Sequence, residues 1–115
     1  MSEVCVWFNP GCSKCLTARD LLEGRSVDVE YFQYLDRAPS RPEIEHVMSL
    51  LGIDDPRAMM RTGEDVYGGL RLDRADRDRL IDAMVEHPIL IERPIVIRGE
   101  RAVVARPPER LLELF

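Results

Sequence analysis

Two cysteines three residues apart, Cys12 and Cys15, are the residues of this 115-residue chain best suited to chemistry. They follow an apolar run at 4–8 and a turn at 9–11, and an apolar stripe of helical period continues from them to Leu22. Cys12 is therefore expected at the start of a helix. Unpaired backbone N–H groups and the positive end of the helix dipole meet there, and both favour a thiolate nucleophile over a thiol.

The spacing of the two cysteines favours a redox pair. Positions i and i+3 of a helix lie on one face, about 5–6 Å apart at Cβ, and a cap residue slightly off the helix can approach the roughly 3.8 Å of a disulfide. A strand before Cys-x-x-Cys and a helix after it are typical of redox motifs. Two alternatives stay open, a pair of unreactive thiols and a zinc site, although Cys5, His46 and His87 are not spaced as its missing ligands.

Length and composition indicate one compact domain with a single core, since 45% of the residues are hydrophobic. The net charge is −5 and the 15 arginines alternate with acidic residues, so we expect no nucleic-acid partner. The chain has no apolar run of membrane-spanning length and no signal-peptide pattern. We therefore expect a cytoplasmic monomer without membrane association, in which Cys5 is buried in the first strand.

The predicted elements follow the order strand, helix, strand, helical insert, strand, strand, helix. They are a strand at 4–8, a helix from Cys12 to Gly24, a strand at 27–32, a helix from the Ser40–Glu43 capping box to Leu51, a short helix from Asp54, a loop to Gly69, a helix at 70–86 capped by Asp73, strands at 95–97 and 102–105, and a last helix at 106–115. This order predicts an α/β, thioredoxin-like fold (β-α-β, helical insert, β-β-α) with a mixed four-stranded sheet. We expect a single domain over 1–115 with its insert at about 40–87, and a cis-proline facing the reactive sulfur at Arg93-Pro94.

Motifs along the whole chain match those of one family. They are Asn9-Pro10-x-Cys12, Tyr34-Leu35 with Pro39-Ser40-Arg41, Arg61 in its short helix, His87-Pro88-Ile89-Leu90-Ile91-x-Arg93-Pro94-Ile95-Val96, and Arg106-Pro107. In these motifs the chain resembles the arsenate reductases of the glutaredoxin-like class. The resemblance implies that Cys12 attacks arsenate while Arg61, Arg93 and Arg106, with Asn9 beside them, hold the oxyanion. We expect no bound cofactor or metal, and glutathione with glutaredoxin, or thioredoxin, as the reductant.

The chemistry of arsenate agrees with this set of arginines. Arsenate is a tetrahedral, phosphate-like dianion near neutral pH, and a guanidinium group offers it bidentate donors that an ammonium group cannot. Arg61, Arg93 and Arg106 are each expected at the end of an element near the sulfur, and the other arginines are interpreted as solvated surface. Nearby cations would also lower the pKa of Cys12.

Two positions depart from the family's single-cysteine pattern. Those members often carry His before Asn-Pro, where this chain has Phe8, and they lack a cysteine at the position of Cys15. Thiolate stabilisation must then come from the helix start and the arginines. Cys15 is expected to resolve Cys12 through a disulfide, unless it only packs in the core.

Two functions of other kinds also stay open. A thiol-stress regulator of the same fold that binds RNA polymerase carries a Cys-x-x-Cys at this junction, and a general thiol-disulfide reductase would keep the same frame. Arg106-Pro107 at the start of the last helix favours the enzyme, because an oxyanion site uses that arginine and a redox-sensing surface does not need it. His87, at a helix end, is interpreted as structural.

Overall fold

The computed structural model describes residues 2–115, which divide into two compact units. The sheet unit comprises the chain up to Tyr34 together with Arg93–Phe115, and the helical unit comprises Leu35–Glu92. No helix within residues 2–115 is long and apolar enough to cross a membrane. The elements are β1 (Val4–Trp7), α1 (Ser13–Glu23), β2 (Val29–Phe32), α2 (Arg41–Leu51), η1 (Pro56–Met59), α3 (Asp65–Gly69), η2 (Leu72–Arg74), α4 (Arg77–Glu86), η3 (Pro88–Leu90), β3 (Ile95–Arg98), β4 (Arg101–Val104) and η4 (Pro108–Leu114), where η denotes a 3-10 helix.

The sheet unit contains the predicted mixed four-stranded sheet, in the order β2-β1-β3-β4. β1 pairs with β2 in parallel and with β3 antiparallel, and β3 and β4 form a hairpin. Gly99 in the hairpin turn has φ 61, a conformation that residues with a Cβ rarely adopt. This topology brings the carboxyl ends of β1 and β2 and the amino end of β3 to one edge of the sheet. Cys12 follows β1, Tyr34 follows β2 and Arg93 precedes β3 at that edge.

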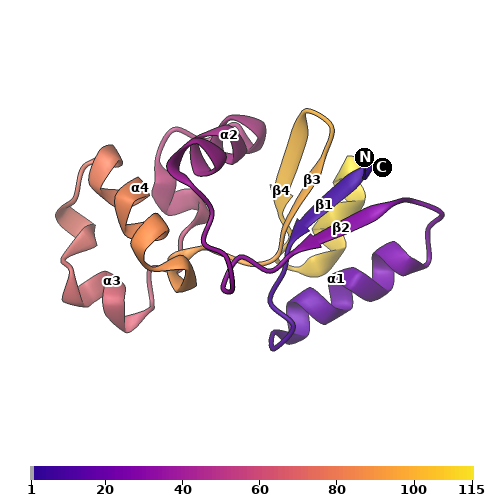
Figure 1. Ribbon diagram of the computed structural model, residues 1–115, viewed down its shortest axis with the longest axis horizontal. Coiled ribbons are helices and arrows are strands. Elements are labelled where there is room, and N and C mark those ends of the chain that lie inside the picture. Colours follow the sequence, from indigo (N-terminus) through magenta and orange to yellow (C-terminus); the bar gives the residue numbers. More distant parts are fainter. Residues whose placement is uncertain (1) are drawn as a thin grey trace. The chain divides into compact units, whose positions relative to one another are not determined.

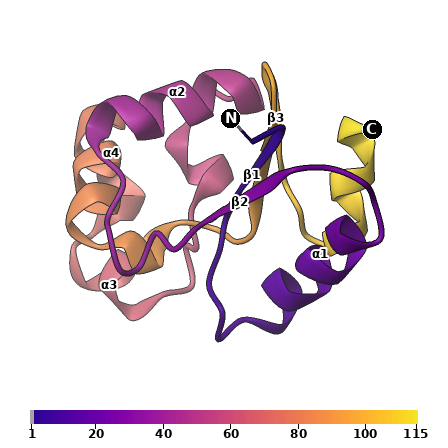
Figure 2. The same cartoon turned by 45° about the vertical axis from the view of Figure 1, so that its right-hand side comes forward.

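The core of the sheet unit lies between the sheet and the two helices α1 and η4, which cover the same face of it (Figures 1 and 2). β1 alternates its side chains, so Val4 and Val6 point into this core. α1 contributes residues at helical spacing, and Cys15, Ala18 and Leu22 are at most 1% exposed. Burial of the α1 stripe therefore fixes the rotation of the helix that carries both thiols.

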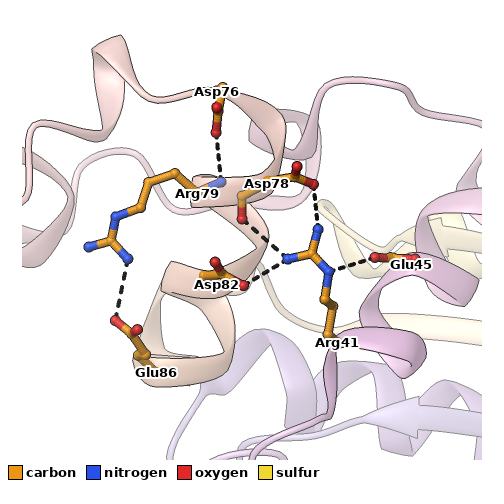
Figure 3. Close-up of polar contacts among 7 residues, drawn as sticks. All are labelled: Arg41, Glu45, Asp76, Asp78, Arg79, Asp82 and Glu86. Atoms are coloured by element: carbon orange, nitrogen blue, oxygen red, sulfur yellow. Dashed lines mark hydrogen bonds and ion pairs between the residues drawn. The ribbon is translucent and has the colours of Figure 1, made fainter.

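The helical unit begins with the predicted capping box. Ser40 accepts the backbone N–H of Glu43 while the Glu43 carboxylate accepts the N–H of Ser40, and Gly52 ends α2 in the left-handed region at φ 72. Arg41 in the first turn of α2 donates to the Asp82 carboxylate at 2.7 Å and also binds Asp78. Figure 3 shows this guanidinium between α2 and α4. These ion pairs hold the start of α2 against α4 within the unit.

The helix predicted at 70–86 begins later than expected, and Asp73 is not its cap. α4 is capped by Asp76, whose carboxylate accepts the Arg79 N–H at 2.8 Å. Arg71 is left-handed at φ 54 and Ala75 is extended, so Asp73 lies in the separate 3-10 turn η2 between them. The short helix α3 lies within the predicted loop before Gly69. The left-handed Arg71 and the extended Ala75 explain the late start of α4. Gly68 and Gly69, which indicated a loop, instead form the last residues of α3.

Candidate active site

Cys12 is the N-cap of α1, at the helix start where it was expected. A tight turn places it there: the Cys12 N–H donates to the Asn9 carbonyl at 3.0 Å, and the Gly11 N–H donates to Asn9 Oδ1 at 2.9 Å. Its backbone is extended at φ −106 and ψ 123, typical of a cap residue. The turn in Asn9-Pro10-Gly11 therefore ends the strand and leaves the Cys12 side chain, 7% exposed, at the first turn of the helix.

The surroundings of Cys12 favour its thiolate. Burial raises the pKa of this thiol, but hydrogen bonds from the backbone N–H of Cys15, the Arg93 guanidinium and the backbone N–H of Lys14 outweigh burial and lower the pKa overall. These donors are the helix start and an arginine, the two sources of stabilisation expected when Phe8 replaces a histidine. Phe8 itself is buried and packs edge-on against Tyr31, with ring centroids 5.1 Å apart.

Cys15 differs from Cys12 in both exposure and ionisation. It is 0% exposed, and burial raises the pKa of its thiol to about 11, helped by the neighbouring Cys12. The backbone N–H of Asn9 points at Cys15 Sγ, 3.5 Å away, and partly opposes this rise. Cys15 is thus less exposed than Cys12 and has the higher pKa. All three cysteines are free thiols, and Cys5, expected to be buried, is only partly so.

Arg93 is the arginine that contacts the reactive sulfur. The peptide bond from Arg93 to Pro94 is cis, as predicted. Burial lowers the pKa of Arg93, but its hydrogen bond to Cys12 and the charge of that thiolate raise it overall. Within the described part of the chain its Nε and Nη1 are buried and have no hydrogen-bond partner. Buried donors without acceptors are rare and costly, and they are explained here if a ligand accepts from them.

Arg106 is held next to Arg93 within the sheet unit. Its Nη1 donates to the Arg93 carbonyl at 3.1 Å, and the peptide bond from Arg106 to Pro107 is also cis. β4 runs antiparallel to β3, so the end of β4 lies beside the start of β3, and the Ala105 N–H donates to the Pro94 carbonyl at 2.8 Å. Two of the three predicted arginines thus come together in one unit, and one of them binds Cys12.

Arg61 belongs to the helical unit, and it does not lie in the short helix where it was expected. η1 ends at Met59, and Arg61 follows a β-bridge between Met60 and Ile91. The backbone N–H of Arg61 donates to the Leu90 carbonyl at 2.7 Å. A binding site that Arg61 shares with Cys12 stays a prediction.

Tyr34 had no role assigned from the sequence, although it lies at the same sheet edge as Cys12. It follows β2, is 1% exposed, and its phenol adds a smaller electrostatic contribution to the raised pKa of Arg93. The available signal was a tyrosine two residues after the predicted strand at 27–32, within the Tyr34-Leu35 motif. Within residues 2–115 no group of three or more His, Cys, Asp or Glu could hold a metal ion.

A sequence model of the ArsC family matches residues 7–114. The chain belongs to the ArsC family. It is 41% identical over 113 residues to an arsenate reductase of Neisseria meningitidis serogroup A, covering 96% of this chain and 97% of that protein. An arsenate reductase of Haemophilus influenzae is 42% identical over 115 residues, covering 98% and 99%. A solved arsenate reductase from Vibrio cholerae is 40% identical with a TM-score of 0.95, covering 99% and 98%, and this match confirms the predicted fold class.

Proposed function

We propose that this ArsC-family chain reduces arsenate to arsenite, with Cys12 as the nucleophile. One observation carries the proposal: a helix-capping thiol of lowered pKa is hydrogen-bonded to Arg93, whose buried Nε and Nη1 find no acceptor among residues 2–115. A tetrahedral oxyanion at the sulfur would supply those acceptors. The relatives named arsenate reductases, similar over nearly their full lengths, support the same substrate.

The oxyanion would be bound by Arg93 and Arg106 of the sheet unit and by Arg61 of the helical unit. Charge-assisted hydrogen bonds to a guanidinium are stronger than neutral ones and can be bidentate. Asn9 would contribute only its side-chain N–H groups, because its Oδ1 already accepts the Gly11 N–H. The arginines also neutralise the charge that would repel an anionic nucleophile from an anionic substrate.

In the first step the Cys12 thiolate attacks the arsenic atom. A sulfur–arsenic bond forms, one arsenic–oxygen bond breaks, and the oxygen leaves as water after taking up protons, so arsenic stays in oxidation state V. Arg93 exchanges its hydrogen bond to the thiolate for bonds to the substrate oxygens. The lowered pKa of Cys12 makes this thiolate available near neutral pH.

In the second step we infer that Cys15 resolves the adduct. Its sulfur attacks Cys12 Sγ, a disulfide forms, and the electron pair of the sulfur–arsenic bond goes to arsenic, which leaves as arsenite in oxidation state III. The two cysteines lose the two electrons that arsenic gains. Two observations support this role. The side chain of Cys12 interacts with that of Cys15, and the Asn9 N–H, 3.5 Å from Cys15 Sγ, stabilises Cys15 as it loses its proton.

We further infer that the chain is one domain with a helical insert and that it acts as a monomer. We place it in the cytoplasm, where thiols are kept reduced. Either glutathione with glutaredoxin or thioredoxin would reopen the disulfide. The test is arsenite formation with glutathione plus glutaredoxin in one arm and thioredoxin plus its reductase in the other. Arsenate-dependent arsenite in either arm supports the proposal and names the reductant. Disulfide reduction without arsenite in both arms would instead indicate a general thiol-disulfide reductase.

A further inference from the structure

Arg61 is fixed beside Glu92 by backbone pairing within the helical unit. The Arg61 N–H donates to the Leu90 carbonyl at 2.7 Å, and the Glu92 N–H donates to the Met59 carbonyl at 2.8 Å, on either side of the Met60–Ile91 bridge. Two short segments that are distant in sequence are thereby held side by side. The position of the Glu92 carboxylate next to Arg61 is consequently built into the fold of this unit.

Two carboxylates flank the guanidinium of Arg61. Glu64 Oε1 lies 3.4 Å from Nη1, and Glu92 Oε1 lies 3.9 Å from Nε. The three side chains are 24–27% exposed, more buried than most ion pairs of this chain. Both distances exceed the roughly 2.7–2.9 Å of a charge-assisted hydrogen bond. An incoming anion could therefore replace either contact without breaking a short bond.

Flanking carboxylates are a disadvantage for an arginine that binds a fully deprotonated anion. Like charges close together repel, and partly buried charges are screened less than exposed ones. The arrangement is favourable only if the anion carries a hydrogen that a carboxylate can accept. Hydrogenarsenate and hydrogenphosphate carry an O–H near neutral pH, whereas sulfate has no proton to donate.

We propose that Glu64 and Glu92 are specificity-determining residues that accept the O–H of a protonated tetrahedral oxyanion bound to Arg61, and so reject sulfate. The inference rests on the proposed function for one point, that Arg61 binds the substrate oxyanion. Any anion on this guanidinium meets the two carboxylates, because both lie within ion-pair distance of it. Rejection of sulfate by carboxylates that repel it is a recognised way to gain specificity at a cost in affinity.

The test measures binding of arsenate, phosphate and sulfate by titration calorimetry to the full chain carrying Cys12→Ser, which prevents turnover. Glu64→Gln, Glu92→Gln and their combination are added to it. A glutamine keeps an oxygen that accepts O–H and removes the repelling charge, so phosphate and arsenate binding should be retained. Sulfate affinity relative to phosphate should rise about tenfold in the double variant, because the single O–H of hydrogenphosphate satisfies one carboxylate and sulfate satisfies neither. Glu86→Gln, in the exposed pair with Arg79 at 3.5 Å, is the matched control and should leave the ratio unchanged.

An unchanged sulfate-to-phosphate ratio in the double variant, with arsenate still bound, would overturn the inference and leave the proposed function standing. An equal loss of affinity for all three anions, accompanied by a lower melting temperature, would reveal a merely structural role and would also overturn it. If the Cys12→Ser protein and the reduced wild type both failed to bind arsenate, the proposed function itself would be contradicted, and this inference with it.

Discussion

Arg93 in the sheet unit and Arg61 in the helical unit have opposite surroundings, although both are proposed to hold one oxyanion. Arg93 donates to the Cys12 sulfur, and two of its buried nitrogen atoms, Nε and Nη1, have no acceptor within the described residues. Arg61 lies between two carboxylates, Glu64 and Glu92. The guanidinium of Arg93 therefore has donors available to a ligand, whereas the charge of Arg61 is already balanced by carboxylates.

The difference suggests a division of work between the two units. The groups that lower the pKa of Cys12 most come from the sheet unit: the N–H groups of Lys14 and Cys15, and the Arg93 side chain. The sheet unit therefore contains both the nucleophile and the groups that activate it. The helical unit contributes an arginine whose neighbours can distinguish one anion from another.

The largest effect should come from the nucleophile. Cys12→Ser is expected to lower arsenate reduction on the order of 1000-fold or more, because a hydroxyl group is not ionised near neutral pH and cannot replace the thiolate. Cys5→Ser, in β1, is the control and should leave turnover nearly unchanged. Steady-state arsenite production measures both, and substantial turnover by the Cys12 variant would contradict the mechanism.

Substitutions of the three arginines should have the next largest effect on arsenate reduction. They also allow the contributions of the two units to be compared. Arg93→Lys and Arg106→Lys should each lower kcat/KM for arsenate about 10–100-fold, because an ammonium group keeps the charge but not the bidentate geometry. Arg61→Lys should also lower kcat/KM, by a similar or smaller factor because two carboxylates already balance its charge. Kinetics with arsenate as the varied substrate provide the comparison. Wild-type kinetics in all three variants would place the anion site elsewhere.

The ionisation of Cys12 should respond to one arginine only. Because its pKa is lowered, the thiolate persists at pH values where an ordinary thiol is protonated, and it is lost as the pH falls through that lowered pKa. Arg93→Gln should move this transition to higher pH, and Arg61→Gln should leave it in place. The pH dependence of Cys12 alkylation by iodoacetamide, followed by mass spectrometry, reports the shift. Equal shifts in both variants would remove the proposed division of work.

The smallest effect concerns two glycines that end helices in the two units. Gly52→Ala should destabilise the protein by about 1 kcal/mol, because φ is 72 there, although an added Cβ would meet no atom within 4 Å. Gly24→Ala, where φ is −73, should be neutral or slightly stabilising. Denaturant unfolding compares the two. Equal stability changes would argue against backbone conformation as the cause.

Local sequence signals predicted the part of the site that a continuous segment builds. The apolar run before Asn9-Pro10-Gly11 and the stripe after it placed Cys12 at a helix start, and the Ser40–Glu43 capping box is present as predicted. These features depend on residues a few positions apart. Proline and glycine restrict such segments strongly enough to be recognised without tertiary contacts.

The remaining features depend on contacts between segments distant in sequence. No residue near Arg61 in the sequence indicates that it pairs with Leu90 beside a β-bridge or that Glu92 lies next to it. The electrostatic effect of the Tyr34 phenol on Arg93 likewise depends on the sheet topology. Asn9 was predicted as an oxyanion ligand, yet its Oδ1 is used by the turn that positions Cys12. The start of α4 was missed because Arg71 adopts a left-handed conformation that its residue type rarely favours.

One turnover in the absence of any external thiol tests most directly whether the sheet unit supplies both nucleophile and resolving thiol. Fully reduced protein is mixed with arsenate, trapped with acid, and analysed for arsenite and for disulfides by mass spectrometry. We predict one arsenite per protein and a Cys12–Cys15 bridge in the wild type, and an arsenic adduct on Cys12 without arsenite in Cys15→Ser. The opposite result would be arsenite that appears only after glutathione is added, with Cys15 still a free thiol in the wild type and unchanged turnover in Cys15→Ser. That result would contradict the resolving role of Cys15.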